Sequence, residues 1–112
     1  MFILDAHQNI AYNAQQLGRN YLLPVWEQRR KQHVPNVPLP VNGLADALLG
    51  RVGIVFASLL TIPEASPTKQ LWDQHTYKNT AEAYSLAMWQ MDYYKRLVDE
   101  SDQIRIMQTQ RE

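Results

Sequence analysis

The chain has 112 residues, enough for one small domain, and its hydrophobic fraction of 46% and charged fraction of 20% suit an ordinary globular protein. Eleven basic and eleven acidic side chains cancel, so net charge gives no reason to expect a nucleic acid or an anionic membrane as partner. The absence of cysteine excludes disulfides, thiolate metal sites and a cysteine nucleophile. Because no signal peptide or bilayer-spanning apolar run is recognisable, we expect a cytoplasmic protein.

A short apolar run near the start of the chain leads directly into polar side chains. Residues 2–5 predict a buried strand, and the sequence continues as DAHQN at positions 5–9. α/β proteins place their ligands at the carboxyl ends of strands. Asp5, His7 and Asn9 would share one face if the extended backbone persisted. Imidazole and carboxylate bind zinc well and an amide oxygen binds it weakly, so this is a candidate metal site; the alternative for His7 is an ordinary strand-end histidine.

Two short helices are expected after this strand. Residues 10–17 favour a helix that ends at Gly18, whose freedom at positive φ suits a helix C-cap. Residues 24–32 predict a second helix with Pro24 near its first turn. The charged cluster in this second helix is typical of a solvated helix face.

A proline-rich connection and a third short helix follow. Residues 33–40 contain three prolines in six positions, which predicts an extended surface segment. Residues 41–49 favour a helix with Asn42 as its N-cap and Gly50 at its end.

The most distinct strand signal lies in the middle of the chain. Residues 52–60 are rich in β-branched and aromatic side chains and lack polar alternation, which predicts a central strand of a parallel sheet, covered on both faces. Its small residues, Gly53, Ala57 and Ser58, would admit a close approach by another group or simple packing of a helix on the sheet.

The following segment, residues 62–78, predicts a loop that is unusually rich in aromatic side chains. It contains Trp72, His75 and Tyr77. Loops after strands carry functional sites in α/β folds, so these side chains could line a substrate pocket. The alternative is that Trp72 and Tyr77 only anchor the loop.

A long helix is predicted to start after Asn79. Residues 79–82 form a capping box, in which the Asn79 side chain accepts from the amide of Glu82 and the Glu82 side chain reaches back to the amide of Asn79. The helix should run to about Glu100. Its apolar stripe at three- and four-residue steps indicates core packing and comprises Tyr84, Ala87, Met88, Met91, Tyr94 and Val98.

The end of the chain predicts a third strand and the start of a further helix. Residues 104–107 favour the strand, and residues 109–112 repeat the capping-box pattern with no helix after it. The predicted order is therefore a βαβαβ series that stops within a unit. It indicates an α/β fragment of a larger protein.

These features resemble the N-terminal part of the membrane dipeptidase family (renal dipeptidase-like, peptidase family M19) of the amidohydrolase superfamily. Members open with a strand that runs into Asp-x-His-x-Asp, and here Asn9 replaces the second aspartate. The resemblance continues through the strand at 52–60, the helix at 79–100, the strand at 104–107 and the helix start at 109–112. It covers the whole chain as roughly the first third of a family member.

The resemblance implies the first βαβαβ portion of a TIM-barrel-like metallohydrolase, an incomplete barrel in which residues 1–112 form one fragment without a second domain. It also implies dipeptide hydrolysis at a binuclear zinc centre, where the metal ions polarise the peptide carbonyl and activate water. By carry-over, His7 is a zinc ligand and Asn9 holds the position of the aspartate ligand, which weakens the site. Because the other family ligands follow later, we assign no catalytic residue and expect weak or absent zinc binding and an inactive isolated chain.

Two alternatives stay open. The chain could be a non-catalytic truncated relative that acts as a small α/β interaction module and self-associates through open sheet edges. It could also belong to another amidohydrolase-type barrel with a different substrate, since strand-end His-x-acid motifs recur in that superfamily. A dipeptide is the expected substrate only if a C-terminal part completes the site, and no interpretation includes a nucleic acid or a membrane.

Overall fold

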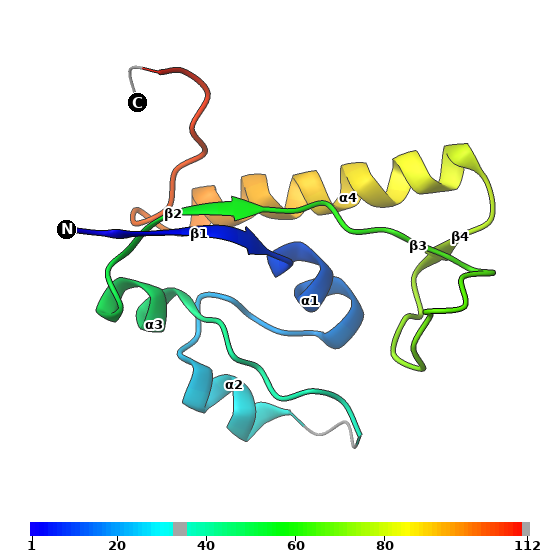
Figure 1. Ribbon diagram of the computed structural model, residues 1–112, viewed down its shortest axis with the longest axis horizontal. Helices are drawn as coiled ribbons and strands as arrows, with labels where there is room; N and C mark the ends of the chain where they lie inside the picture. The colour runs from blue at the N-terminus through cyan, green and yellow to red at the C-terminus, as the bar shows by residue number, and fades with distance from the viewer. Residues whose placement is uncertain (33–35, 111–112) are drawn as a thin grey trace.

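The computed structural model describes residues 1–32 and 36–110. In chain order its elements are β1 (Ile3–Gln8), α1 (Ile10–Leu17), α2 (Val25–Lys31), α3 (Leu44–Leu49), β2 (Val52–Ala57), β3 (Ile62–Pro63), β4 (Thr76–Tyr77) and α4 (Thr80–Glu100) (Figure 1). They form a small mixed α/β domain, as the sequence predicts at the level of fold class. Within these described ranges, none of the helices has both the length and the apolar character that crossing a membrane requires.

Two pairs of parallel strands make up the sheet structure. β1 pairs with β2, and the two-residue strands β3 and β4 pair with each other. Parallel neighbours need a long crossover, which α1, α2 and α3 provide between β1 and β2 (Figure 1). The parallel arrangement of the two predicted strands is confirmed. The segment between β2 and α4 was predicted to be only a loop, and that prediction missed the short β3–β4 pair.

The pairing of β1 with β2 is irregular at two points. Leu4 pairs with Ile54 and Asp5 with Val55, but Gln8 pairs with Ala57. Two residues of β1 therefore occupy the interval that one residue occupies in β2, which is the arrangement of a β-bulge. The bulge lies at the end of β1 that carries the candidate site.

The close approach expected at Gly53 is made by a side chain of the same chain. A Cβ built at this position would lie 2.7 Å from Cδ2 of Phe2 and 2.9 Å from its Cγ. The absence of a side chain at Gly53 thus lets the Phe2 ring rest on β2. The group that packs on this part of the strand is an aromatic ring from the N-terminus and not a helix.

α1 and α2 agree closely with their predictions. α1 ends at Gly18, which has φ 66° in the left-handed region and donates its amide to the carbonyl of Asn13. α2 follows Pro24, and its charged residues lie on a solvated face, where Glu27 is 3.7 Å from Arg30 and 3.6 Å from Lys31. Such exposed pairs contribute little stability. Residues 33–35, the first part of the predicted extended connection, lie outside the described residues.

α3 is shorter than predicted, and its N-cap is a different residue. It begins at Leu44 with Gly43 as N-cap, and no side chain caps it. The prediction of Asn42 as N-cap is wrong: the Asn42 carbonyl accepts from the Gln28 side chain at 2.9 Å, which ties the residue to α2. Gly50 ends the helix as predicted.

β2 stops at Ala57, before the predicted end at residue 60. The backbone of Leu60 is paired by a side chain instead of a strand, because Gln90 of α4 accepts from its amide at 2.8 Å and donates to its carbonyl at 2.6 Å. Gln90 lies outside the predicted apolar stripe of α4, yet only 3% of it is exposed. A buried amide needs both donor and acceptor satisfied, and this backbone position satisfies both.

The predicted start and end of α4 are confirmed. Of the two hydrogen bonds of the predicted capping box, one is present. Asn79 Oδ1 accepts from the Glu82 amide at 2.9 Å, but Glu82 Oε2 accepts from the amide of Lys78, at 2.6 Å, and not from that of Asn79. The apolar stripe packs only in part: Tyr94 packs against the core around Leu97, a buried residue outside the predicted stripe, whereas Tyr84 near the helix start is 68% exposed.

The predicted strand at residues 104–107 does not form. This segment has no regular secondary structure, although Ile104 packs against the small core of Ile10, Tyr21 and Leu97. A strand exists only when its amides and carbonyls find a partner strand, and within residues 1–32 and 36–110 no strand pairs with this segment. The second capping-box signal extends to Arg111 and Glu112, which lie outside the described residues.

The sheet itself is poorly covered. The exposed fractions are 53% for Ile3, 51% for Leu4 and 59% for Phe56. The prediction that residues 52–60 are covered on both faces is therefore wrong for the described chain. The cover is partial: Val55 of β2 packs against the core that includes Leu97 of α4, but the described residues do not bury both faces of the strands.

Candidate functional site

The carboxyl ends of β1 and β2 meet at one edge of the sheet, as expected for parallel neighbours. The amide of Ser58, which follows β2, donates to the carbonyl of Gln8 at 2.9 Å. The Ser58 hydroxyl also forms a short hydrogen bond with Oδ1 of Asn9. The residue after β1 is thus held directly by the residue after β2.

A tyrosine from the long helix ties this junction to the start of α1. The Tyr94 hydroxyl donates to the carbonyl of Ser58 at 2.7 Å and accepts from the amide of Ala11 at 3.2 Å. Burial raises the pKa of Tyr94 above its usual value, so the hydroxyl stays protonated and can donate. The sequence predicts Tyr94 only as part of an apolar stripe, and no local pattern indicates its polar role.

Both carboxylate oxygens of Asp5 accept hydrogen bonds from neighbouring residues of the chain. Oδ2 accepts from Nε2 of Gln8 at 2.7 Å, and Oδ1 accepts from the amide of His7 at 3.0 Å. These two hydrogen bonds, the one from Gln8 first, lower the pKa of the Asp5 carboxyl. Asp5 therefore accepts a hydrogen bond from a neighbouring residue with each of its two carboxylate oxygens.

His7 and Asn9, the two predicted metal ligands, differ in their surroundings. His7 lies on the bulge and is exposed, while Asn9 is partly buried and its Oδ1 accepts from Ser58. The condition under which Asp5, His7 and Asn9 share a face is not met, because the bulge and the turn into α1 interrupt the extended backbone. Asn9 itself has φ −97° and ψ 55°.

These residues do not make a complete zinc centre. A catalytic zinc has three protein ligands, and within the described chain no three histidine, cysteine or acidic residues are grouped so that they could hold a metal. Of the remaining histidines, His33 lies outside the described residues, and the His75 ring packs edge-on against Trp89 at 4.8 Å between centroids. Of the predicted zinc ligands, His7 supplies a good donor, its imidazole, and Asn9 supplies only a weak one, a neutral amide oxygen.

The aromatic loop between β2 and α4 is anchored on α1. Nε1 of Trp72 donates to the Tyr12 hydroxyl at 3.1 Å, and this hydroxyl forms a short hydrogen bond with the buried carboxylate of Asp73. Gln16 pairs with the backbone of His75, donating at 2.7 Å and accepting at 3.0 Å. The anchoring interpretation of Trp72 is confirmed. Tyr77 likewise holds the loop through its backbone, pairing with Pro63 in the β3–β4 strands.

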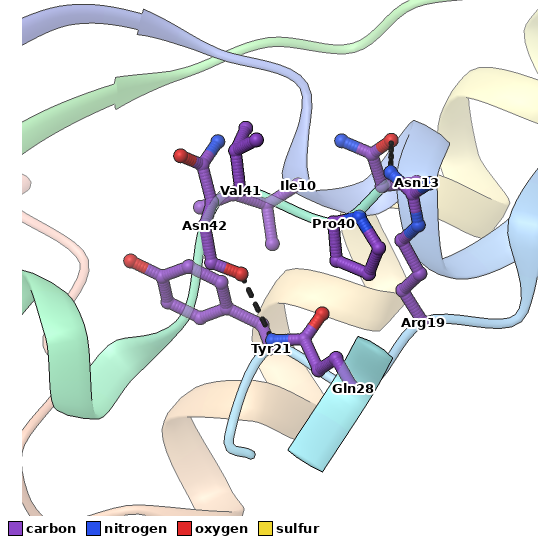
Figure 2. A pocket seen from close by; sticks show the side chains of 8 residues that line it. All are labelled: Ile10, Asn13, Arg19, Tyr21, Gln28, Pro40, Val41 and Asn42. Atoms are coloured by element: carbon purple, nitrogen blue, oxygen red, sulfur yellow. Dashed lines mark hydrogen bonds between the residues drawn. The ribbon is translucent and has the colours of Figure 1, made fainter. Parts of the chain in front are cut away.

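A cavity lies between α1, α2 and the proline-rich connection (Figure 2). Its volume of about 30 Å³ suits a single water molecule and not a dipeptide. The Arg19 guanidinium beside it donates to Oδ1 of Asn13 at 3.1 Å and to Oε1 of Gln32 at 3.2 Å. Burial lowers the pKa of Arg19. The hydrogen bonds of Arg19 beside the cavity join α1 to the end of α2. We do not assign the cavity to the candidate site at the ends of β1 and β2.

No family model, curated protein or solved structure matches the chain. The dipeptidase assignment therefore depends on the DAHQN motif and on the order of the elements, and it stays a prediction. The geometry contributes a parallel strand pair in which His7 lies near the carboxyl end of β1, and Asn9 and Ser58, the residues that follow β1 and β2, are joined by a hydrogen bond.

Proposed function

We propose that this chain is the N-terminal segment of a dipeptidase-like metallohydrolase, in which β1 and β2 are neighbouring strands of a (β/α)₈ barrel. The observation that supports the proposal is the exposure of His7 near the carboxyl end of β1, two residues before Asn9, whose side chain is hydrogen-bonded to Ser58 after β2. Enzymes with this barrel build their sites at that end of the strands.

The bare sheet also favours a larger assembly. Ile3 and Leu4 are neighbours in β1 and lie on opposite faces of the strand, yet both are about half exposed, as is Phe56 of β2. In a closed barrel one face packs inside and the other meets the helices. Covering the exposed half of such a side chain contributes about 1 kcal/mol, roughly half of the value for complete burial, so a partner layer would stabilise these strands.

Within this proposal the chain contributes part of a metal centre and not the whole of it. His7 would supply one imidazole ligand, and Asn9 stands at the position of an acidic ligand with a neutral amide whose oxygen already accepts from Ser58. When bound, zinc would supply the activation of water. The other ligands would come from residues outside this chain, so the isolated 112-residue chain should lack dipeptidase activity.

The exposed strands support one other function. A two-stranded sheet with apolar side chains and open edges can recruit a further strand, which would make the chain an interaction module that self-associates. This alternative needs no metal and predicts a folded species without dipeptide turnover. Its distinguishing feature is association that depends on protein concentration.

Three measurements separate these functions. Zinc content after dialysis and hydrolysis of a panel of dipeptides are measured on the 112-residue chain, and the coding sequence beyond it is read for a strand ending in glutamate and two later strand-end histidines. The proposal expects little zinc, no turnover and the presence of those later residues. Stoichiometric zinc with turnover would refute the incomplete site, and a coding sequence without the later ligands would favour the interaction module.

A further inference from the structure

We propose that Asp5 is a positioning residue for His7: its carboxylate holds the β-bulge that places the imidazole at the carboxyl end of β1. The importance of this position for a reaction depends on the proposed function, but the geometric role of Asp5 does not. The inference concerns a residue to which the resemblance assigns no metal and no catalytic step.

The bulge is defined by the strand register. Asp5 pairs with Val55 and Gln8 pairs with Ala57, so Ala6 and His7 together lie opposite Phe56. A bulge leaves its extra residue out of the ladder and redirects the side chains beside it. Bulges are enriched next to active sites for that reason.

The carboxylate of Asp5 compensates for the interrupted ladder. Its Oδ1 accepts from the amide of His7, two residues along the chain, at 3.0 Å. This is the local geometry by which aspartate side chains hold a turn. The hydrogen bond fixes the backbone at His7, and therefore the point from which the imidazole leaves the strand.

Gln8 fixes the carboxylate in turn. Its Nε2 donates to Oδ2 of Asp5 at 2.7 Å, and its own side chain is buried, with 8% exposed. The backbone of Gln8 belongs to the regular part of the sheet, since it pairs with Ala57 and its carbonyl accepts from Ser58. The exposed imidazole of His7 is thus connected through Asp5 to a rigid, buried position.

The role of Asp5 can be tested with the conservative variant Asp5→Asn, because Oε1 of Gln8 is available to accept a hydrogen bond from the new amide. This oxygen is buried and has no hydrogen-bond partner within the described part of the chain. In an Asp5→Asn variant, the new amide oxygen can still accept from the His7 amide, and a turned Gln8 side chain can accept from the new NH₂ group. Asp5→Ala removes both hydrogen bonds.

The experiment measures amide hydrogen exchange and imidazole ¹H–¹³C shifts of His7 by NMR in the full chain without metal. Asp5→Ala should speed exchange at the His7 amide by about tenfold and shift the imidazole signals, because one hydrogen bond is lost. Asp5→Asn should stay within about threefold of the unmodified protein. Asp99→Ala, which removes an exposed carboxylate at the end of α4, is the matched control and should change neither signal.

A second variant covers the case in which Asp5→Ala does not fold. Gln8→Met keeps the shape of the side chain but removes its hydrogen bond to Asp5, so it should also speed exchange at His7. Unchanged His7 signals in Asp5→Ala, or in Gln8→Met where the first variant does not fold, would overturn the positioning role, and so would equal changes in Asp99→Ala. Since no metal is used, this result is independent of the zinc and turnover measurements that test the proposed function.

Discussion

The hydroxyl of Ser58 donates to the side-chain oxygen of Asn9, so the residues that follow two parallel strands are joined through their side chains. Under the proposed function, Asn9 stands at the position of an acidic ligand. The contact with Ser58 orients the Asn9 amide but leaves it neutral, so this position adds no negative charge.

Restoring the acid at this position should strengthen metal binding. In Asn9→Asp the Ser58 hydroxyl can donate to the new carboxylate, and the added negative charge should raise the affinity for zinc by roughly tenfold or more. Competition with a chromophoric zinc chelator measures the change. Gln103→Glu, which adds the same charge at an exposed position after α4, should leave the affinity unchanged. Equal affinities of Asn9→Asp and the unmodified chain would argue against a metal site at these strand ends.

The hydroxyl of Tyr94 should contribute to stability in addition to the packing of its ring. Tyr94→Phe keeps the packing but leaves the carbonyl of Ser58 and the amide of Ala11 without their partner, which costs about 1–3 kcal/mol in the free energy of unfolding. Urea denaturation followed by circular dichroism measures it. Tyr84→Phe, at a side chain that is 68% exposed, is the matched control and should change stability little. A loss of the same size in both variants would contradict the bridging role of Tyr94.

Signals that are local in sequence predicted the structure well, and signals that depend on distant partners did not. The end of α1 at Gly18 and the start of α4 after Asn79 follow from caps that lie within a few residues. The contact of Tyr94 with Ala11 spans 83 positions and has no local pattern. Residues 104–107 have the composition of a strand, but no strand pairs with them in the part of the chain that the structure describes.

The candidate site shows the same division. The position of His7 after an apolar strand was predictable, because the motif and the strand are adjacent in sequence. The bulge that displaces His7 was not, since it depends on the register between β1 and β2. The alternation of side chains along an extended strand therefore predicted that Asp5 and His7 share a face. In the structure, the Asp5 carboxylate instead accepts hydrogen bonds from the His7 amide and the Gln8 side chain.

The anchor of the aromatic loop should make stability fall at high pH. Burial first, and then the hydrogen bond with Asp73, raise the pKa of Tyr12 from 10.0 to about 12. A group whose pKa is raised in the folded state contributes its stability fully below the unfolded value and loses it as pH rises through the folded value. The free energy of unfolding should thus decrease between about pH 10 and pH 12. Urea unfolding across this range measures the slope, which Tyr12→Phe should reduce.

Asp73→Asn provides the matched test of the cause. It removes the carboxylate but keeps a hydrogen-bond acceptor beside the Tyr12 hydroxyl. The pKa of Tyr12, followed by phenolate absorbance, should then decrease toward its usual value. An unchanged titration would mean that Asp73 does not raise the pKa of Tyr12.

The uncovered sheet should associate with other copies when the isolated chain is concentrated. Phe56 of β2 is 59% exposed, and burying such a side chain contributes about 1.5–3 kcal/mol. Phe56→Lys should weaken self-association by at least roughly tenfold, because a lysine charge resists burial and opposes edge-to-edge pairing of strands. Sedimentation velocity at increasing protein concentration measures the effect. Leu71→Lys changes a fully exposed side chain in the loop, away from β1 and β2, and should leave association unchanged. A chain that stays monomeric at every concentration, with or without Phe56→Lys, would show that the open strands do not recruit a second copy.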